Sequence, residues 1–335
     1  MSKQGIASSR MVFAVAATLV LAATLKSPGT TPSRQASTDT VVSGKFLNPL
    51  QVALLYWYPA NLTTQLPVGV GPYGLVFDGA DVWVANNTSN TVTKLRTSDG
   101  KLLGTFTVGA FPFGVTFDGA NIWVSSQSTG NVTKVRASDG TVLGNFPVGV
   151  GSTGVAFDGA NIWVASQDLN NVTKLRARDG AVLGTFSVGT SPQFLAFDGA
   201  NIWTANFNSN NVTKLRASDG AVLGTFTVGT NPLGVAFDGA NIWVSNVGSN
   251  NVTKVRGSDG VVLGTFTVGA SPWGVSFDGA NIWVANHSGG TVSKLRASDG
   301  AVLGTFTVGT TPFGVAFDGA NIWVANYSSN TVSKL

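Results

Sequence analysis

The chain has 335 residues, with 42 glycines, no cysteine and a single histidine, His287. All of its 16 acidic residues are aspartate, so glutamate is absent as well. This composition excludes a disulfide framework, a cysteine nucleophile and a histidine-rich metal site. The formal net charge of +4 includes Lys3, Arg10 and Lys26 near the start of the chain, whereas the basic pairs that recur further on, such as Lys94 and Arg96, are matched by aspartates. Because nucleic-acid binding needs clustered positive charge, no nucleic-acid partner is predicted.

The first 49 residues differ in composition from the rest of the chain. Lys3 and Arg10 precede an uncharged, largely apolar run from Met11 to Leu25. A spanning helix needs about 20 apolar residues, so residues 1–25 are predicted to be a secretory signal peptide, with an uncleaved signal anchor as the alternative. Residues 26–49 are rich in Ser, Thr, Pro and Gly and are predicted to be a flexible tether. We therefore expect a secreted, periplasmic or envelope-tethered protein that meets a membrane only through an uncleaved anchor.

Residues 50–335 are dominated by a repeat. The string Phe-Asp-Gly-Ala recurs seven times at a spacing of 40 residues, from Phe77 to Phe317. Each unit holds four short runs rich in β-branched and aromatic residues, which in the second unit are 114–117, 121–125, 131–136 and 142–148. Turn-forming Gly, Asn, Asp and Ser separate these runs. The pattern predicts an all-β fold, a seven-bladed β-propeller of four-stranded, 40-residue blades with strands A to D from the inside outward.

The second strand of each unit indicates how the blades pack. Ile122, Trp123 and Val124 are consecutive apolar residues, so this strand should be covered on both faces. Blade-on-blade stacking provides that cover, and the repeated tryptophan is predicted to be a core residue rather than a ligand-stacking residue. The aspartates of the Phe-Asp-Gly and Ser-Asp-Gly turns are predicted to cap their own backbone, with weak Ca²⁺ binding as the alternative.

The two ends of the repeat region predict how the ring closes. The last unit stops after its third strand at Leu335, and a segment matching the missing outer strand, residues 65–69, precedes the first unit. We expect this N-terminal strand to complete the seventh blade and so remove an open sheet edge. Residues 51–58 also fall in register with a third strand and compete with residues 331–335 for that place. The C-terminal segment is the favoured one.

The repeat resembles a known family. The run from Asn211 to Gly220, the run from Val228 to Gly239 and the ending Ser329–Leu335 are similar to the YVTN-type, NHL-like β-propeller repeat of exported bacterial proteins. The resemblance spans residues 65–335 and implies the propeller architecture. Propellers of this kind serve as surface proteins, binding modules and enzymes, so the resemblance alone does not imply an activity.

Two enzyme types have similar blades, the virginiamycin B lyase type and the gluconolactonase type. The first implies a catalytic His and Glu with a magnesium ion, and the second implies a metal held by acidic residues that include Glu. With no Glu and only His287, this chain matches neither set of residues. We therefore predict no catalytic residue, no metal site and no cofactor.

The differences between units locate a candidate binding surface. They concentrate in the segment entering strand A and in the loop between strands B and C, which lie on the same face because strands alternate in direction. Exposed aromatics around a channel mouth are typical of binding sites, and Thr153, Gln167 and Asp168 should lie opposite them. The residues predicted to form the site are Tyr73, Phe113, Gln193, Phe207, Trp273, His287, Phe313 and Tyr327.

The function predicted from these observations is a non-catalytic binding or interaction module for a protein, peptide or glycan, and we expect a monomer. The first alternative is a multivalent, lectin-like carbohydrate-binding propeller with sites between blades. A lyase or lactonase is the third, and it would have to use His287 and Asp168.

Overall fold

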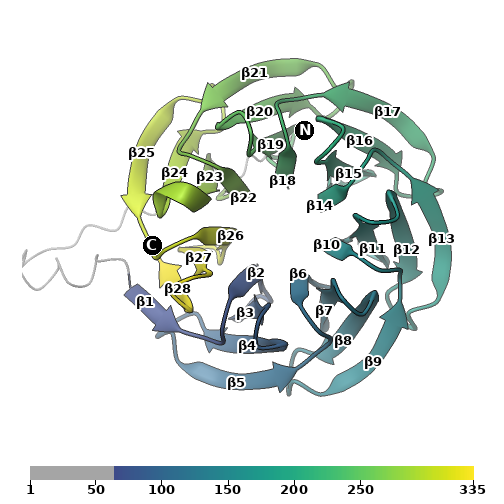
Figure 1. Ribbon diagram of the computed structural model, residues 1–335, viewed down its shortest axis with the longest axis vertical. Helices are drawn as coiled ribbons and strands as arrows, with labels where there is room; N and C mark the ends of the chain where they lie inside the picture. The colour runs from purple at the N-terminus through teal and green to yellow at the C-terminus, as the bar shows by residue number, and fades with distance from the viewer. Residues whose placement is uncertain (1–63) are drawn as a thin grey trace, which may run out of the picture. The chain divides into compact units, whose positions relative to one another are not determined.

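The computed structural model describes residues 64–335, which form seven four-stranded antiparallel sheets arranged in a ring (Figure 1). The predicted seven-bladed β-propeller is confirmed. The predicted signal segment, the tether and residues 50–63 lie outside the described residues. Within residues 64–335, no helix is long and apolar enough to cross a membrane.

The strands follow the predicted order in every blade, and blade 1 comprises the strands from Pro72 to Thr107. The inner strands A are β2 (Pro72–Phe77), β6 (Pro112–Phe117), β10 (Ser152–Phe157), β14 (Pro192–Phe197), β18 (Pro232–Phe237), β22 (Pro272–Phe277) and β26 (Pro312–Phe317). The B strands are β3 (Asp81–Asn86), β7 (Asn121–Ser126), β11 (Asn161–Ser166), β15 (Asn201–Asn206), β19 (Asn241–Asn246), β23 (Asn281–Asn286) and β27 (Ile322–Asn326).

The outer half of each blade is equally regular. The C strands are β4 (Thr91–Arg96), β8 (Asn131–Arg136), β12 (Asn171–Arg176), β16 (Asn211–Arg216), β20 (Asn251–Arg256), β24 (Thr291–Arg296) and β28 (Thr331–Lys334). The D strands are β5 (Leu102–Thr107), β9 (Val142–Pro147), β13 (Val182–Ser187), β17 (Val222–Thr227), β21 (Val262–Thr267), β25 (Val302–Thr307) and β1 (Thr64–Pro67). A single 3₁₀ turn, η1 (His287–Gly289), interrupts this pattern among the described residues.

The hydrophobic core lies between neighbouring blades. Trp123 and Val132 of blade 2 pack against Ile162, Val164 and Leu175 of blade 3, and equivalent clusters fill the other interfaces. The B strands are almost wholly buried, as their continuous apolar runs predict. Each blade therefore depends on its neighbours for burial, and the ring is the stable unit.

The A–B turns carry a repeated hydrogen-bond arrangement. Asp118 Oδ1 accepts from the backbone N–H groups of Ala120 and Asn121 at 2.9 and 2.7 Å, which confirms the predicted capping role. Its Oδ2 also accepts from Trp123 Nε1 at 2.7 Å, a contact that the sequence did not predict. Burial raises the pKa of Asp118, but these hydrogen bonds outweigh that effect and hold the pKa below its usual value.

A lysine on six of the seven C strands links one blade to the next among the described residues. Lys134 Nζ lies 5.0 Å from the ring centroid of Trp123 and donates to the carbonyl oxygen of Ala177 in the following blade at 2.7 Å. Lys334 makes the same contact across the closure of the ring, to the Thr97 carbonyl oxygen at 2.6 Å. We call these residues the linking lysines. Those with such a carbonyl acceptor among the described residues are Lys94, Lys134, Lys174, Lys214, Lys254 and Lys334.

The ring closes as predicted. Strand β1 pairs antiparallel with β28, and Gln65 lies opposite Ser333, so the N-terminal strand completes blade 7 (Figure 1). The third strand of that blade is β28, which decides the competition in favour of residues 331–335. Leu66 packs in the core between blades 7 and 1, beside Val332 and Leu95.

Candidate functional site

The face carrying the D–A and B–C connections, which we call the loop face, brings the variable residues together. The backbone N–H of each variable B–C residue donates to a carbonyl of the D–A connection in the same blade, as His287 does to Ser271 at 3.0 Å and Tyr327 to Thr311 at 3.0 Å. The acceptor residues have left-handed backbones, with a φ of 52° at both Ser271 and Thr311. Each loop residue is therefore held beside the start of its inner strand, at the mouth of the central channel.

An aromatic cluster occupies one side of this mouth. Tyr73 stacks on Phe313 with ring centroids 4.3 Å apart and contacts Phe113 at 4.2 Å. Trp273 meets Phe313 edge-on at 4.5 Å, and Tyr327 meets it at 5.2 Å. The structure thus brings blades 6, 7, 1 and 2 together here as predicted.

The expectation that the aromatic residues around the channel mouth are exposed is wrong for three of them. Tyr73, Phe113 and Phe313 are buried, because they cover one another where the inner strands converge. Burial, and the neighbouring Tyr327 to a lesser degree, raise the pKa of Tyr73 well above its usual value, so its hydroxyl stays protonated. The cluster partly fills the channel mouth. It also forms one wall of a cavity on the loop face.

His287 lies on η1 at the edge of the cluster. Its imidazole stacks on Trp273 at 5.6 Å between ring centroids and meets the edge of Phe313 at 4.8 Å. Burial against these rings lowers the pKa of His287 below the ordinary value of 6.5. The imidazole is therefore neutral at pH 7 and has a free lone pair that can accept a proton.

Amide side chains lie across the mouth from the aromatic cluster. Gln193 is buried and its Nε2 donates to Gln167 Oε1 at 3.0 Å. Thr153 is also buried and donates to the carbonyl oxygens of Pro192 and Gln193 at 3.1 Å, so its hydroxyl joins two blades. Asp168 is exposed on its loop.

The aromatic and amide sides enclose a cavity of about 600 Å³ on the loop face. Asn87, Gln127 and Ser191 complete its polar wall. His287 stacks on the lining residue Trp273 at the edge of the cavity and is not itself among the lining residues. The predicted site residues that line the cavity are Tyr73, Phe113, Gln193, Phe207, Trp273, Phe313 and Tyr327.

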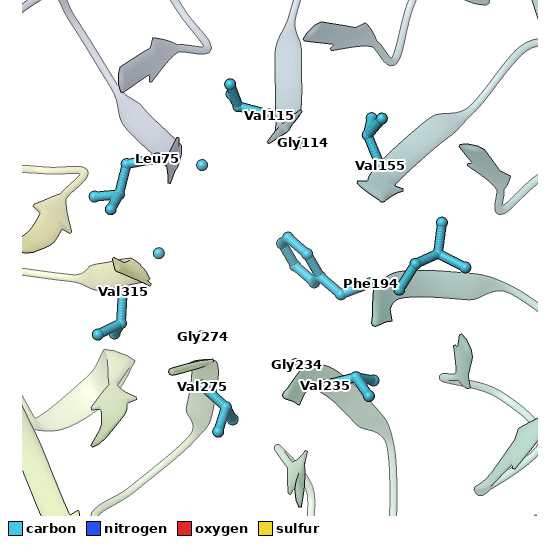
Figure 2. A pocket seen from close by; sticks show the side chains of 13 residues that line it. Leu75, Gly114, Val115, Val155, Phe194, Gly234, Val235, Gly274, Val275 and Val315 are labelled. Carbon is cyan, nitrogen blue, oxygen red and sulfur yellow. The ribbon is translucent and has the colours of Figure 1, made fainter. Parts of the chain in front are cut away.

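Phe194 was not predicted to belong to the site. Figure 2 shows its ring extending into the middle of the channel, while Val115, Val155 and Val315 point away from the middle. Its ring centroid lies 5.4 Å from that of Phe113, so it packs against the cluster, and it lines a channel cavity of about 140 Å³. The sequence could have indicated this residue, because the other six units have glycine at the position of Phe194.

The residues around the cavity do not fit a divalent metal ion. Hard cations prefer several carboxylate oxygens, whereas this cavity is lined by amides, hydroxyls, aromatics and aliphatics. Over residues 64–335, no three His, Cys, Asp or Glu side chains come together as a metal-binding group. The aspartates of the A–B turns lie at the opposite ends of the strands and are occupied by their own turns.

No protein-family model and no curated protein matches the sequence. Solved structures do resemble the fold. A catalytically inactive histidine-to-alanine variant of virginiamycin B lyase from Staphylococcus aureus, solved with quinupristin, has 18% identity and a TM-score of 0.71 over 81% of this chain and 98% of that chain. A streptogramin B lyase has 17% identity and a TM-score of 0.70 over 81% and 96%. The hydrazine synthase of Kuenenia stuttgartiensis has 19% identity and a TM-score of 0.71 over 82% and 97%.

These comparisons contradict the predicted function. The structural neighbours include lyases, and none of them supports a non-catalytic binding module or its lectin-like alternative. The prediction rested on the missing glutamate and on a search for the residues of metal-dependent enzymes. It left a lyase or lactonase that uses His287 and Asp168 as the third alternative only. At the identities found, the likeness shows the fold.

Proposed function

We propose that the loop-face cavity is an active site for elimination chemistry, with His287 as the general base. The observation that carries the proposal is the placement of the only imidazole in the chain, stacked on Trp273 at the edge of the cavity. A general base must be unprotonated at the working pH, and burial of His287 favours that state.

The reaction that suits this site needs no metal. The imidazole takes a proton from a carbon beside a carbonyl group, the electrons of that C–H bond form a double bond, and the bond from the neighbouring carbon to its leaving group breaks. The leaving group departs with the electron pair and is protonated from water. Lyases act by elimination of this kind, and the virginiamycin B lyase variant that lacks one histidine is described as catalytically inactive.

The cavity wall favours an uncharged substrate with an aromatic group. Trp273 and Phe313 offer an apolar surface for such a group, while Gln193 and Gln127 can bond to amide or ester oxygens. No charged side chain lines the cavity to balance a charged ligand. A peptide-like molecule with aromatic substituents meets these requirements.

Quinupristin, the molecule bound to one structural neighbour, is the probe for a direct test. The purified protein is incubated with quinupristin, the products are separated, and their masses are measured by mass spectrometry. Elimination adds no water to the substrate, whereas hydrolysis adds one. We expect elimination with the parent protein. In His287→Ala the rate should fall by at least about 100-fold, which is the usual contribution of a general base to the rate.

Ser249→Ala is the matched control, because Ser249 lies on another B–C loop of the same face, its hydroxyl accepts from the backbone N–H of Thr230 at 2.7 Å, and it does not line the cavity. It should leave the rate unchanged. Unaltered quinupristin after incubation with the parent protein, or turnover that survives in His287→Ala, would overturn the proposal.

We also propose that the protein is exported and that its repeat is of the YVTN type. The charge-free run from Met11 to Leu25 supports export, and the pattern from Val228 to Gly239 supports the repeat type. N-terminal sequencing of the protein from the outer fractions of a producing cell tests the first point. A terminus at Met1 in the cytoplasmic fraction alone would contradict it.

A further inference from the structure

Two side chains of blade 1 present polar atoms to the loop-face cavity that the fold itself does not use. Asn87 and Tyr73 both line this cavity, and they are only 9% and 7% exposed. Among residues 64–335, no protein group forms a hydrogen bond with Asn87 Oδ1 or with the Tyr73 hydroxyl. Because buried polar atoms are normally paired, two unpaired ones in a cavity wall indicate contacts that a ligand completes.

Both atoms are open to the cavity rather than sealed in the core. The side-chain atoms that are fully enclosed and unpaired in residues 64–335 belong to other residues, such as Thr204 and Asn206. Asn87 Oδ1 and the Tyr73 hydroxyl are therefore accessible to a molecule that enters from the loop face.

The orientation of the Asn87 amide is fixed by its neighbours. Its Nδ2 donates to the carbonyl oxygen of Pro112 at 3.1 Å, in a buried contact. A carbonyl oxygen only accepts, so the nitrogen must face Pro112 and the amide oxygen must be the free atom. The backbone N–H of Asn87 also donates to the Gly71 carbonyl oxygen at 2.8 Å, which holds the residue in place. Asn87 Oδ1 is thus a fixed acceptor that needs a hydrogen from the ligand.

The hydroxyl of Tyr73 is held equally firmly and can donate. Its ring packs between Phe313 and Phe113, with centroids 4.3 and 4.2 Å away. Burial holds the pKa of Tyr73 well above its usual value, so the hydroxyl keeps its proton. The neighbouring Tyr327 hydroxyl bonds instead to Thr88 Oγ1, at 3.2 Å. The proton of Tyr73 is therefore free for a ligand oxygen.

The chemistry of these two atoms narrows the class of ligand. An ester offers a carbonyl oxygen to Tyr73 but has no hydrogen for Asn87. A carboxylate would place its oxygens against Asn87 Oδ1, and no lining cation offsets the burial of its charge. An uncharged carboxamide supplies both an N–H donor and a carbonyl acceptor.

We propose that Asn87 and Tyr73 select a carboxamide group, with Asn87 Oδ1 accepting from its N–H and the Tyr73 hydroxyl donating to its carbonyl oxygen. The inference rests on the proposed function only in taking the loop-face cavity as the substrate site. The aromatic surface of Trp273 and Phe313 remains for the rest of the molecule. The substrate class is thereby narrowed to molecules that combine an aromatic group with an amide carrying a free N–H.

Benzamide and methyl benzoate are a matched pair of probes, because both are uncharged aromatic carbonyl compounds and only the amide has an N–H. Neither has a proton on a carbon beside its carbonyl group, so binding is measured without turnover. The affinity of the full chain for each probe is followed by NMR through the ring signals of His287, the only imidazole, which stacks on Trp273. We expect benzamide to bind more tightly by at least about tenfold, since methyl benzoate leaves Asn87 Oδ1 unpaired.

Two variants separate the two contacts. Tyr73→Phe removes no hydrogen bond within the described protein, and it should weaken both probes by about tenfold while the preference for benzamide remains. Asn87→Leu should weaken benzamide alone, so that the preference disappears. Ser249→Ala, which lies outside the cavity lining, is the control and should change neither affinity.

The parent protein alone can overturn the inference, by binding the two probes equally well or by binding neither at millimolar concentration. This holds even if Asn87→Leu fails to fold. A preference that survives in Asn87→Leu, or affinities unchanged in Tyr73→Phe, would overturn it as well. A protein that prefers benzamide but leaves quinupristin unaltered would retain this inference and lose the proposed activity, so the two failures are distinguishable.

Discussion

At the scale of single residues, the repeat is defined by a tryptophan with two polar partners. In blade 4, Trp203 Nε1 donates to Asp198 at 2.8 Å, and Lys214 lies over the ring at 5.1 Å. The buried indole thus has its one polar atom paired, which is the condition for placing tryptophan in a core. Residues that depart from the repeat are then the informative ones, and blade 4 has two, Phe194 and Thr204.

Thr204 stands where the other six units have valine, and its buried Oγ1 has no hydrogen-bond partner. Replacing Thr204 by Val removes an unsatisfied hydroxyl at nearly constant shape, so the free energy of unfolding should rise by about 1 kcal/mol. Chemical unfolding measures this change. The control is Thr213→Val, which should lower the free energy of unfolding, because Thr213 Oγ1 accepts from Asn206 at 2.8 Å. A destabilised Thr204→Val variant would show that the hydroxyl has a partner after all.

His287 gives a pH dependence whose sign follows from its lowered pKa. In the unfolded chain the imidazole takes up a proton near pH 6.5, whereas in the folded protein burial delays uptake to lower pH. Stability should therefore fall as pH drops from 6.5 toward the folded-state pKa, and it should be unaffected by this group above 6.5. Since there is one histidine, its NMR titration is unambiguous, and the midpoint should lie below 6.5. Trp273→Ala should move it upward, whereas Gln193→Ala should not.

At the scale of elements, the outer strands carry a bulge that disfavours pairing of their exposed edges with other molecules. In blade 1, Lys94 pairs with Gly104 and Leu95 with Leu102, so Leu103 forms a bulge in β5. The same shift recurs in the C–D pairs of blades 2 to 6. A bulge bends the edge strand and disfavours pairing with another molecule. Blade 7 differs, since its outer strand comes from the other end of the described chain.

Deleting residues 45–69 should therefore expose the edge of β28 and uncover Val332 and Leu95. We expect aggregation or a large fall in the temperature of unfolding, measured by scattering and calorimetry. Deleting residues 26–44 is the control and should have little effect. A monomeric 45–69 deletion variant with the stability of the parent would contradict the closure through β1.

At the scale of the whole molecule, the sequence was sufficient to predict the architecture but not the details of the candidate site. Blade number, strand order and closure followed from one exact period and from the complementary ends of the repeat. The grouping of the aromatic residues also followed, but the burial of Tyr73 and Phe313 did not, because it depends on how closely the inner strands converge. The lowered pKa of His287 did not follow from the sequence either, since sequence alone does not show the burial that causes it.

The contribution of β1 to blade 7 has a consequence for assembly. This strand is joined to β28 by hydrogen bonds and packing alone, and every copy of the chain presents the same edge. Two chains that fold close together can exchange these strands, each completing the other's ring with the pairing of β1 and β28 preserved. Refolding at high protein concentration should then yield a dimer that separates slowly on dilution, and refolding at low concentration should yield monomers alone.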